Sequence, residues 1–349
     1  MDKLRIVLAG AGLIGRRHAQ LLAASPRACL AAVADPGEAA RAFARGAGVP
    51  HFDSLQALFA AVPGVDGAIL ATPNALHVQG AMECAAHGIG ALIEKPVADS
   101  LPEGRRLLQA LRDGGVPMLV GHHRRHSAVL QAARAAIAQG RLGRIVSVLG
   151  SAQFHKPQDY FDAAPWRSQA GGGPVLINLI HEMDNLRYLC GEVVGVQAMA
   201  SDAVRGFAVE DTVVIGLRFA SGALGSFALS DTAACPWSWE HTSGENADYP
   251  RHADQDCYWI AGTRGSLAVP TLRSWRYEGE ASWRHPFSTH TLPLSGRDPL
   301  QAQLDHFCDV LQGKAAPLVS VEDAMRSLEV VDAVQRAIAS GVLVAPSVA

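Results

Sequence analysis

The chain has 349 residues, a length that suits about two domains of ordinary size. Hydrophobic residues make up 49% of it and charged residues 18%, which is typical of a globular protein and leaves little for long disordered segments. The net charge of -3 excludes the strong basic field that nucleic-acid binding needs, and no apolar run approaches the roughly 20 residues of a membrane span. We therefore expect neither a nucleic-acid partner nor a membrane partner.

The N-terminus and the cysteines bear on the cellular compartment. An apolar strand begins within the first few residues, and no small-residue cleavage site follows a leader core, so we expect no signal peptide and a cytoplasmic location. The six cysteines are scattered, without a C-x-x-C pair or a regular spacing. This pattern favours buried free thiols over a disulfide framework or a zinc site, and we expect no metal.

The first 121 residues alternate between short apolar runs and longer amphipathic segments. Such alternation predicts β-α-β units around a parallel sheet, and strands buried on both faces read as continuous apolar runs. We expect a dinucleotide-binding domain over residues 1–121. The expected strands are 4–9, 28–34, 67–71, 91–94 and 117–121, and the expected helices are 13–24, 38–45, 74–87 and 101–113.

After Gly121 the pattern changes to strands that follow one another through short glycine-containing turns. This pattern predicts an α+β domain over residues 122–349 with an open, mostly antiparallel sheet, so that the whole chain is of the α/β class. Two helices near 300–312 and 321–340 should close the structure. The other expected elements are helices at 127–139 and 175–189 and strands at 143–150, 193–200, 210–219, 222–230, 257–261 and 265–269.

A glycine-rich turn follows the first expected strand. It reads GAGLIG, with the G-x-G-x-x-G spacing, directly after a strand and directly before a helix. In that context the glycines permit a tight turn and a close approach of the backbone to a pyrophosphate, whereas an ordinary glycine turn is the alternative. The cofactor-binding residues that we expect in this turn are Gly10, Gly12, Leu13, Ile14 and Gly15.

The second expected strand ends in Ala34 and Asp35, and Asp35 lies 20 residues beyond Gly15. A carboxylate at this distance can accept hydrogen bonds from an adenosine ribose and would repel a 2'-phosphate. The sequence therefore predicts NAD as the cofactor. Arg16 and Arg17 keep the use of NADP possible.

Two further loops follow strands of the same expected sheet, and ligands of doubly wound sheets bind beyond the carboxyl ends of the strands. The loop ATPNALH offers Thr72, Asn74 and His77 to a cofactor, although the same residues would also suit a simple helix start. The second loop begins with Glu94 and Lys95, and the following proline keeps Lys95 extended. We expect Glu94 and Lys95 to face the cofactor.

With these motifs the chain resembles the Gfo/Idh/MocA family of oxidoreductases. The matching segments are GAGLIG, ATPNALH, IEKP at 93–96, GGGPVLINLIHEMDNLRYLCG at 171–191 and the C-terminal pair of helices. The resemblance covers essentially the whole chain. It implies a Rossmann domain, a second domain that binds substrate, hydride transfer between NAD(P) and a sugar, polyol or related carbonyl compound, and homodimers or homotetramers that pack sheet to sheet.

The resemblance also implies a catalytic pair. His181 matches the family's catalytic histidine and would exchange the hydroxyl proton, while Lys95 would bind the same substrate oxygen. The alternative is that His181 is an ordinary helix histidine. Many relatives carry an aspartate four residues before the histidine, but this chain has Ile177 there, and Asn178, one place later, can donate hydrogen bonds to substrate but cannot take a proton.

Other polar residues are candidates for binding the substrate. Arg124, Lys156 and Arg167 suit a substrate carboxylate, which would mean a sugar acid, although they suit solvated or stacked positions as well. Trp166 precedes Arg167. The aromatic segment at 235–250 resembles a loop that lines a sugar site, but a role in the core or in a subunit contact fits it equally well.

We therefore expect an NAD-dependent oxidoreductase that transfers hydride to or from a sugar, an inositol-like polyol or a sugar acid. Two alternatives keep the same fold. One is a non-catalytic NAD-binding sensor or regulatory protein, against which the presence of both Lys95 and His181 argues. The other is an enzyme whose tightly bound NAD is recycled within each turnover.

Overall fold

The computed structural model describes residues 2–112, 115–294 and 296–347. These residues form two compact units: residues up to 126 together with 298–328, and residues 127–297 together with those from 329 onward. The N-terminal part of the first unit ends at residue 126, where the sequence predicted a boundary at 121, and this unit also contains the segment 298–328, which the sequence assigned to the second domain. In the described residues no helix is long and apolar enough to cross a membrane.

The first unit contains a parallel sheet of six strands in the order β3-β2-β1-β4-β5-β6. This order confirms the predicted Rossmann-type sheet. The strands β4, β5 and β6 are wholly buried because helices cover both faces of such a sheet. The strands are β1 (Leu4–Ala9), β2 (Ala28–Ala34), β3 (His51–Phe52), β4 (Gly67–Leu70), β5 (Gly90–Ile93) and β6 (Met118–Val120).

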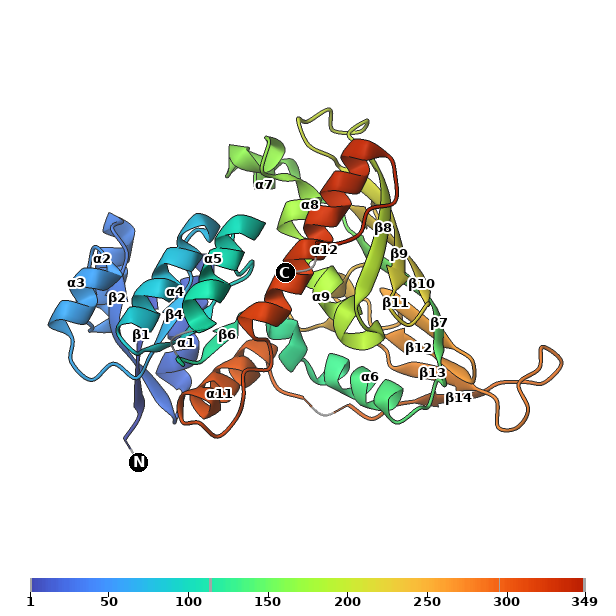
Figure 1. Cartoon of the computed structure of the whole chain (residues 1–349), viewed down its shortest axis with the longest axis horizontal. Coiled ribbons are helices and arrows are strands. Elements are labelled where there is room, and N and C mark those ends of the chain that lie inside the picture. The colour runs from blue at the N-terminus through green and yellow to red at the C-terminus, as the bar shows by residue number, and fades with distance from the viewer. Residues whose placement is uncertain (1, 113–114, 295, 348–349) are drawn as a thin grey trace. The chain divides into compact units, whose positions relative to one another are not determined.

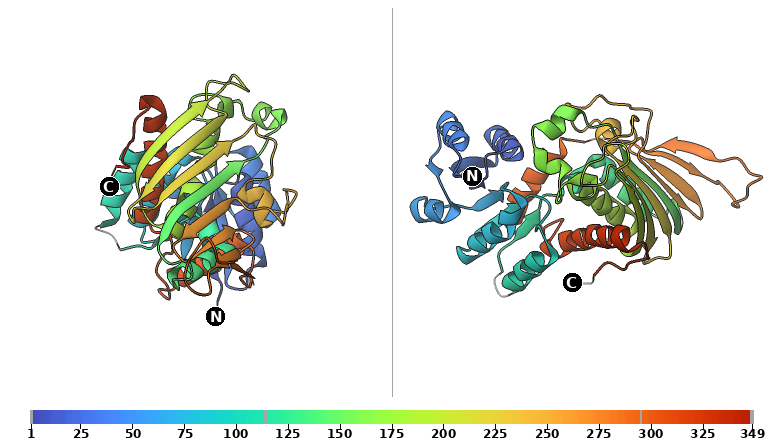
Figure 2. Two further views of the ribbon diagram at one scale, coloured as in Figure 1. Left: turned by 90° about the vertical axis from the view of Figure 1, so that its right-hand side faces the viewer. Right: turned by 90° about the horizontal axis from the view of Figure 1, so that it is seen from above.

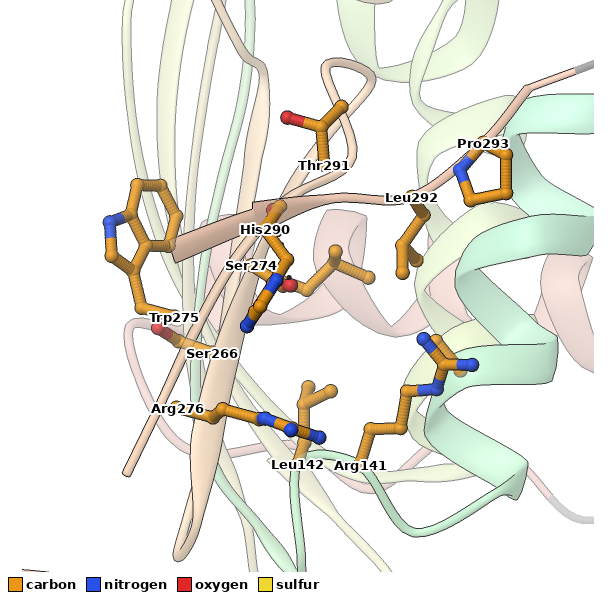
Figure 3. A pocket seen from close by; sticks show the side chains of 12 residues that line it. Arg141, Leu142, Ser266, Ser274, Trp275, Arg276, His290, Thr291, Leu292 and Pro293 are labelled. Atoms are coloured by element: carbon orange, nitrogen blue, oxygen red, sulfur yellow. Dashed lines mark hydrogen bonds between the residues drawn. The ribbon is translucent and has the colours of Figure 1, made fainter. Parts of the chain in front are cut away.

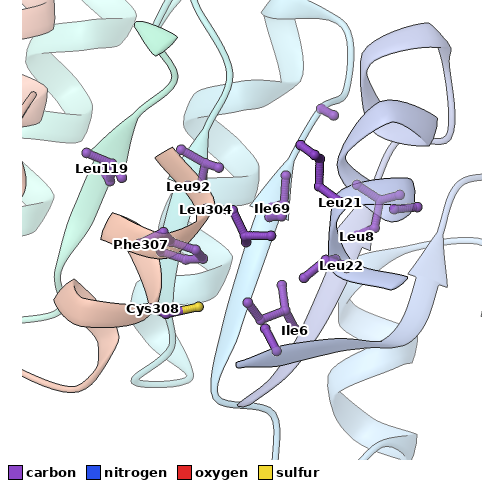
Figure 4. Close-up of a cluster of buried hydrophobic side chains, with 13 residues drawn as sticks. Ile6, Leu8, Leu21, Leu22, Ile69, Leu92, Leu119, Leu304, Phe307 and Cys308 are labelled. Atoms are coloured by element: carbon purple, nitrogen blue, oxygen red, sulfur yellow. The ribbon is translucent and has the colours of Figure 1, made fainter. Parts of the chain in front are cut away.

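The helices of this unit include one from the far C-terminal part of the chain, α11 (Pro299–Leu311). Its residues Leu304, Phe307 and Cys308 are buried in one apolar cluster with β-strand residues such as Ile6 and Ile69 (Figure 4). The helix thus completes the core of the first unit. The other helices are α1 (Leu13–Ala24), α2 (Glu38–Ala47), α3 (Leu55–Ala61), α4 (His77–Ala86), α5 (Leu101–Arg112) and the short 3-10 helices η1 (Asn74–Leu76) and η2 (His123–His126).

The second unit contains an eight-stranded sheet in the order β14-β13-β12-β11-β7-β10-β9-β8 (Figure 1). It is mostly antiparallel, as predicted, but β7 and β10 pair in parallel. The strands are β7 (Ile145–Gln153), β8 (Val193–Ser201), β9 (Thr212–Phe219), β10 (Leu224–Ser230), β11 (Tyr258–Gly262), β12 (Gly265–Val269), β13 (Arg273–Arg276) and β14 (Ser288–Thr291).

Helices lie on one face of this sheet, and among the described residues no helix covers the opposite face over β8, β9 and β10 (Figure 2, left). The strand β9 shows why: its residues alternate between buried and exposed, with Val213 and Ile215 buried and Val214 half exposed. The helices are α6 (Ala128–Ala138), α7 (Gln158–Asp162), η3 (Pro165–Ser168), α8 (Gly173–Ile177), α9 (Leu179–Cys190), α10 (Trp239–Ser243) and the part of α12 (Val321–Ser340) from residue 329.

The expected helix over 175–189 is two helices. It is interrupted at Asn178, which follows α8 and precedes α9 and has φ -110° and ψ -40°. Since Asn178 lies at this break, its side chain is only half buried while both flanking helices are largely buried. The break therefore gives one polar side chain a position outside the regular helix surface.

Candidate active site

The glycine turn after β1 has three glycines with different surroundings. Gly10 has φ +87°, and a Cβ atom there would lie 2.4 Å from the carbonyl oxygen of Ala71. A Cβ at Gly15 would lie 2.0 Å from the carbonyl oxygen of Gly10, whereas a Cβ at Gly12 would meet no atom within 4 Å. Folding therefore requires Gly10 and Gly15, and Gly12 leaves open space of the kind that a pyrophosphate occupies at a helix N-terminus.

Asp35 connects the end of β2 to this turn. Its Oδ2 accepts a hydrogen bond from the amide of Ala11 at 2.8 Å, and its Oδ1 accepts one from the amide of Gly37 at 2.8 Å. The carboxylate is thus held in a fixed orientation beside the turn. Leu13 at the start of α1 is 94% exposed, an unusual position for a leucine, while Ile14 is half buried against the core.

Glu94 and Lys95 follow β5, at the same edge of the sheet as the glycine turn, because β1, β4 and β5 run in parallel. Glu94 points into the protein: its Oε1 lies 2.7 Å from Nε2 of His18, and its Oε2 accepts a hydrogen bond from the amide of Lys95 at 3.3 Å. Burial alone would raise the pKa of Glu94, but the hydrogen bond and charge of His18 and the charge of Lys95 outweigh it and lower the pKa. Glu94 therefore supports the Lys95 loop from within.

The loop after β4 places its three candidate residues differently. His77 is buried, with Nδ1 2.7 Å from the carbonyl oxygen of Pro96 and Nε2 2.9 Å from that of Thr72. Its ring therefore joins two loops, a position that differs from the cofactor contact expected for its side chain. Thr72 is half buried and Asn74 is exposed.

His181 lies in the first turn of α9 and is buried, with 9% of its surface exposed. The preceding glycines suit the geometry of α8: Gly173 has φ +80°, and a Cβ there would lie 2.6 Å from Oε1 of Glu210. The same Oε1 accepts a hydrogen bond from the amide of Val175 at 3.0 Å. Asp184, one turn after His181, lies 3.9 Å from Arg187, so that it forms a helix ion pair.

Asn178 and Lys156 form a pair that the sequence does not indicate. The ammonium group of Lys156 donates a hydrogen bond of 2.7 Å to Oδ1 of Asn178 and lies 4.0 Å from Oδ2 of Asp231. Arg205 binds the other oxygen of Asp231 at 2.8 Å. Lys156 is 5% exposed, and burial, partly offset by Asp231, lowers its pKa to about 8.

The two arginine candidates have different surroundings. Nη1 of Arg167 donates to the carbonyl oxygen of Tyr160 at 2.5 Å, and the guanidinium lies 3.9 Å from the centre of the Tyr160 ring. Arg124 is buried in η2 with 4% of its surface exposed, whereas Trp166 is 54% exposed. The structure thus brings Lys156, Asn178 and Asp231 together, whereas the indole of Trp166 is exposed to solvent.

The aromatic segment at 235–250 divides between the two roles that its sequence allows. Trp239 is buried, its Nε1 donates to Oε2 of Glu245 at 3.0 Å, and its ring stacks on Tyr258 with centroids 6.0 Å apart. Trp237 is 44% exposed. Trp239 is therefore a core residue, and Trp237 has the exposed indole face that a ligand could use.

A pocket of about 290 Å³ lies elsewhere in the second unit, between the end of α6 and strands β12 to β14. Figure 3 shows Arg141 on its helix side and Arg276 and His290 on its strand side. None of the residues that the sequence suggests for catalysis, cofactor or substrate lines it. Its guanidinium group at Arg276 is paired with Glu278 at 3.2 Å, and we assign it no role in the chemistry.

Comparison with known protein families gives two matches that cover most of the chain. Residues 4–122 match the model of the Gfo/Idh/MocA oxidoreductase family, described as an NAD-binding Rossmann fold. Residues 130–268 match the model of the Gfo/Idh/MocA C-terminal domain. The two matched ranges contain every catalytic and cofactor candidate discussed above, and every substrate candidate except Arg124.

Individual relatives carry related names. The chain is 29% identical over 283 residues to 1,5-anhydro-D-fructose reductase of Ensifer adhaerens, covering 80% of this chain and 79% of the relative. It is 26% identical to scyllo-inositol 2-dehydrogenase (NAD(+)) of Bacillus subtilis, covering 94% and 92%. Among solved structures, the WlbA dehydrogenase of Bordetella pertussis in complex with NADH and UDP-GlcNAcA has 28% identity and a TM-score of 0.81, with 100% of both chains covered.

Proposed function

Because the chain belongs to the Gfo/Idh/MocA family of NAD-binding oxidoreductases, we propose that it is a dehydrogenase that transfers hydride between NAD and a CH-OH group of a sugar or polyol, with His181 and Lys95 as its catalytic residues. The names of the relatives, which include a sugar reductase and an inositol dehydrogenase, support this substrate class. The finer choice among sugars, inositols and sugar acids depends on the residues around His181.

The observation that carries the proposal is the position of Lys95. It stands directly after β5, at the sheet edge where the glycine turn leaves open space at Gly12. Ligands of doubly wound sheets bind at this edge. A lysine in this position, supported from beneath by the buried Glu94, suits a role toward a group that the cofactor reduces or oxidises.

Each residue then has a chemical role. When bound, NAD supplies or accepts the hydride. His181 takes the proton of the substrate hydroxyl during oxidation and returns it during reduction, because the pKa of an imidazole lies near the working pH. Lys95 donates a hydrogen bond to the same oxygen and stabilises the negative charge that develops on it.

The proposed cofactor contacts are in the first unit. The open backbone at Gly12 and the first turn of α1 suit the pyrophosphate, and the exposed Leu13 would cover it. Asp35, held by the amides of Ala11 and Gly37, has carboxylate oxygens beside the turn that suit the ribose hydroxyls of NAD and disfavour a 2'-phosphate.

A substrate screen tests this function. Purified protein is assayed for the formation of NADH or NADPH with a panel of sugars, inositols and aldonic acids, with NAD and NADP in parallel. We expect turnover with at least one compound and a preference for NAD. Binding of NAD without turnover on the whole panel would instead indicate a sensor, and a preference for NADP would contradict the role of Asp35.

We also propose that the uncovered face of the second unit's sheet joins two copies of the chain. Apolar side chains on this face are exposed to an unusual degree, including Leu149 at 56%, Met199 at 73% and Leu224 at 56%. A second identical sheet would bury them. Light scattering should give the mass of a dimer or tetramer, and the substitution Leu149→Lys should shift it toward the monomer, whereas a monomeric wild type would contradict the proposal.

A further inference from the structure

The hydrogen bond from Lys156 fixes which way the Asn178 amide faces. An ammonium group has only donors, so the acceptor oxygen Oδ1 must be the atom toward Lys156, as the distance of 2.7 Å places it. The amino group Nδ2 is then directed away from Lys156. Within the ranges that the structure describes, no protein acceptor bonds to Nδ2, and Asn178 is half buried at the break between α8 and α9.

The contacts of Lys156 leave the Asn178 amide with only its N-H donors to offer to a ligand. Lys156 is held in place by protein contacts: its ammonium lies 4.0 Å from Asp231, and its charge lies over the rings of Phe154 and Tyr160 at 5.7 Å and 5.0 Å. An ammonium bonded to the oxygen of an amide draws electron density from it and strengthens the N-H donors on the other side. A negatively charged acceptor suits such a group.

Asn178 also lies close to His181, the proposed proton acceptor. Asn178 precedes α9 and lies three residues before His181, and its backbone carbonyl accepts a hydrogen bond from the His181 amide. A carboxylate at residue 178 would repel an anionic substrate and would require a donor from it. The amide does neither, and it has two N-H groups to offer.

We propose that Asn178, oriented by Lys156, binds a carboxylate of the substrate, so that the substrate is a sugar acid rather than a neutral sugar or polyol. This inference rests on the proposed dehydrogenase function and narrows its substrate. It assigns a specificity residue, Asn178, and a positioning residue, Lys156. Lys156 and Arg167 were candidates for direct ion pairs with the carboxylate, but their bonds to Asn178 and Tyr160 favour the indirect arrangement.

Binding measurements test this inference independently of turnover. Calorimetry with the NADH-saturated protein compares matched acid and neutral compounds: D-gluconate with D-glucitol, D-galactonate with galactitol, D-glucuronate with D-glucose, and D-galacturonate with D-galactose. We expect the acid to bind more tightly in at least one pair. The variant Asn178→Asp should lower the affinity for that acid by about tenfold or more, and it should change the affinity for the neutral compound of the same pair much less.

A matched control is Gln139→Glu, which makes the same change from amide to carboxylate at an exposed position of the same unit and should leave all affinities unchanged. The variant Lys156→Met should reduce the preference for the acid partially, because it frees the amide to turn. The inference is overturned if no acid binds, if the neutral member binds as tightly in every pair, or if Asn178→Asp keeps the preference. A preserved binding pattern without any NADH formation would count against the proposed function alone.

Discussion

The edge of the Rossmann sheet and the surroundings of His181 differ in what holds their functional groups. At the sheet edge, backbone geometry dominates: Gly10 adopts a positive φ, and a Cβ there would collide with the backbone of Ala71. Around His181, side-chain pairs such as Lys156 with Asn178 hold the polar groups instead. The sheet edge therefore depends on positions where no Cβ atom fits, whereas the surroundings of His181 depend on which side chains are paired.

The largest effect should come from His181. The substitution His181→Asn removes the proposed proton acceptor and should lower kcat by about 10²- to 10⁴-fold with the best substrate. The binding of NAD, measured by calorimetry, should not change. His285→Asn, at an exposed histidine of the same unit, serves as the control and should keep full activity. If His181→Asn kept full activity, no residue of the second unit would have a proposed role in the proton transfer.

Lys95 tests the contribution of the sheet edge. Lys95→Met keeps much of the side-chain volume and removes the hydrogen bond to the substrate oxygen, so we expect kcat to fall by about 10²- to 10³-fold. Circular dichroism should show an unchanged fold. The control Lys314→Met lies at an exposed position. A loss smaller than threefold, on the order of 0.7 kcal/mol, would show that Lys95 only neutralises charge near the cofactor.

The glycines separate folding from binding within one turn. Gly10→Ala places a Cβ 2.4 Å from a backbone oxygen at a positive φ and should destabilise the protein by about 1–3 kcal/mol. The Cβ that Gly12→Ala adds meets no atom within 4 Å, so the melting temperature should not change. The affinity for NAD should fall by about tenfold or more. Thermal melts with and without NAD measure both effects. Equal NAD affinity in Gly12→Ala and wild type would place the pyrophosphate elsewhere.

Substitution of Lys156 should give the smallest effect, a change in the free energy of unfolding whose sign distinguishes two roles of this lysine. Its pKa of about 8 lies below the ordinary value of 10.5 because of burial, while Asp231 and Glu240 oppose the shift and Arg167 and Arg205 add to it. The folded state therefore binds fewer protons than the unfolded state between those two values, and the ammonium costs stability in full below about pH 8. This cost is relieved as the pH rises toward 10.5.

Lys156→Met should thus raise the free energy of unfolding at pH 7 by about 1–2 kcal/mol, and the gain should shrink as the pH approaches 10. Denaturant unfolding at pH 7 and at pH 10 measures it. Asp231 keeps its bond to Arg205 in this variant. A variant less stable than wild type at pH 7 would show that Lys156 serves the fold rather than the recognition of substrate.

The sequence predicts most of the regular structure because burial patterns are local. The strands at 4–9, 28–34 and 265–269 and the helices at 13–24 and 321–340 have the same bounds in the structure. The interruption at Asn178 was not predicted, because LINLIH keeps a helical apolar period across it. The two-residue strand β3 was missed because it is too short to show a period.

The site is predictable only in part. The spacing along the sequence alone indicates which edge of the sheet binds the cofactor, because the glycines, Asp35 and Lys95 directly follow strand ends. The supporting pairs lie far apart in the chain: His18 and Glu94 are 76 residues apart, and Lys156 and Asn178 are 22 apart. No local pattern identifies such partners. The one available signal was a polar residue, His18, on the apolar side of α1.

The imidazole of His77 bridges the loop after β4 and the loop that carries Lys95, with one ring nitrogen at the carbonyl of Thr72 and the other at that of Pro96. His77 therefore ties the loop that carries Thr72 to the residue that follows Lys95, so the backbone at Lys95 is held from outside its own strand.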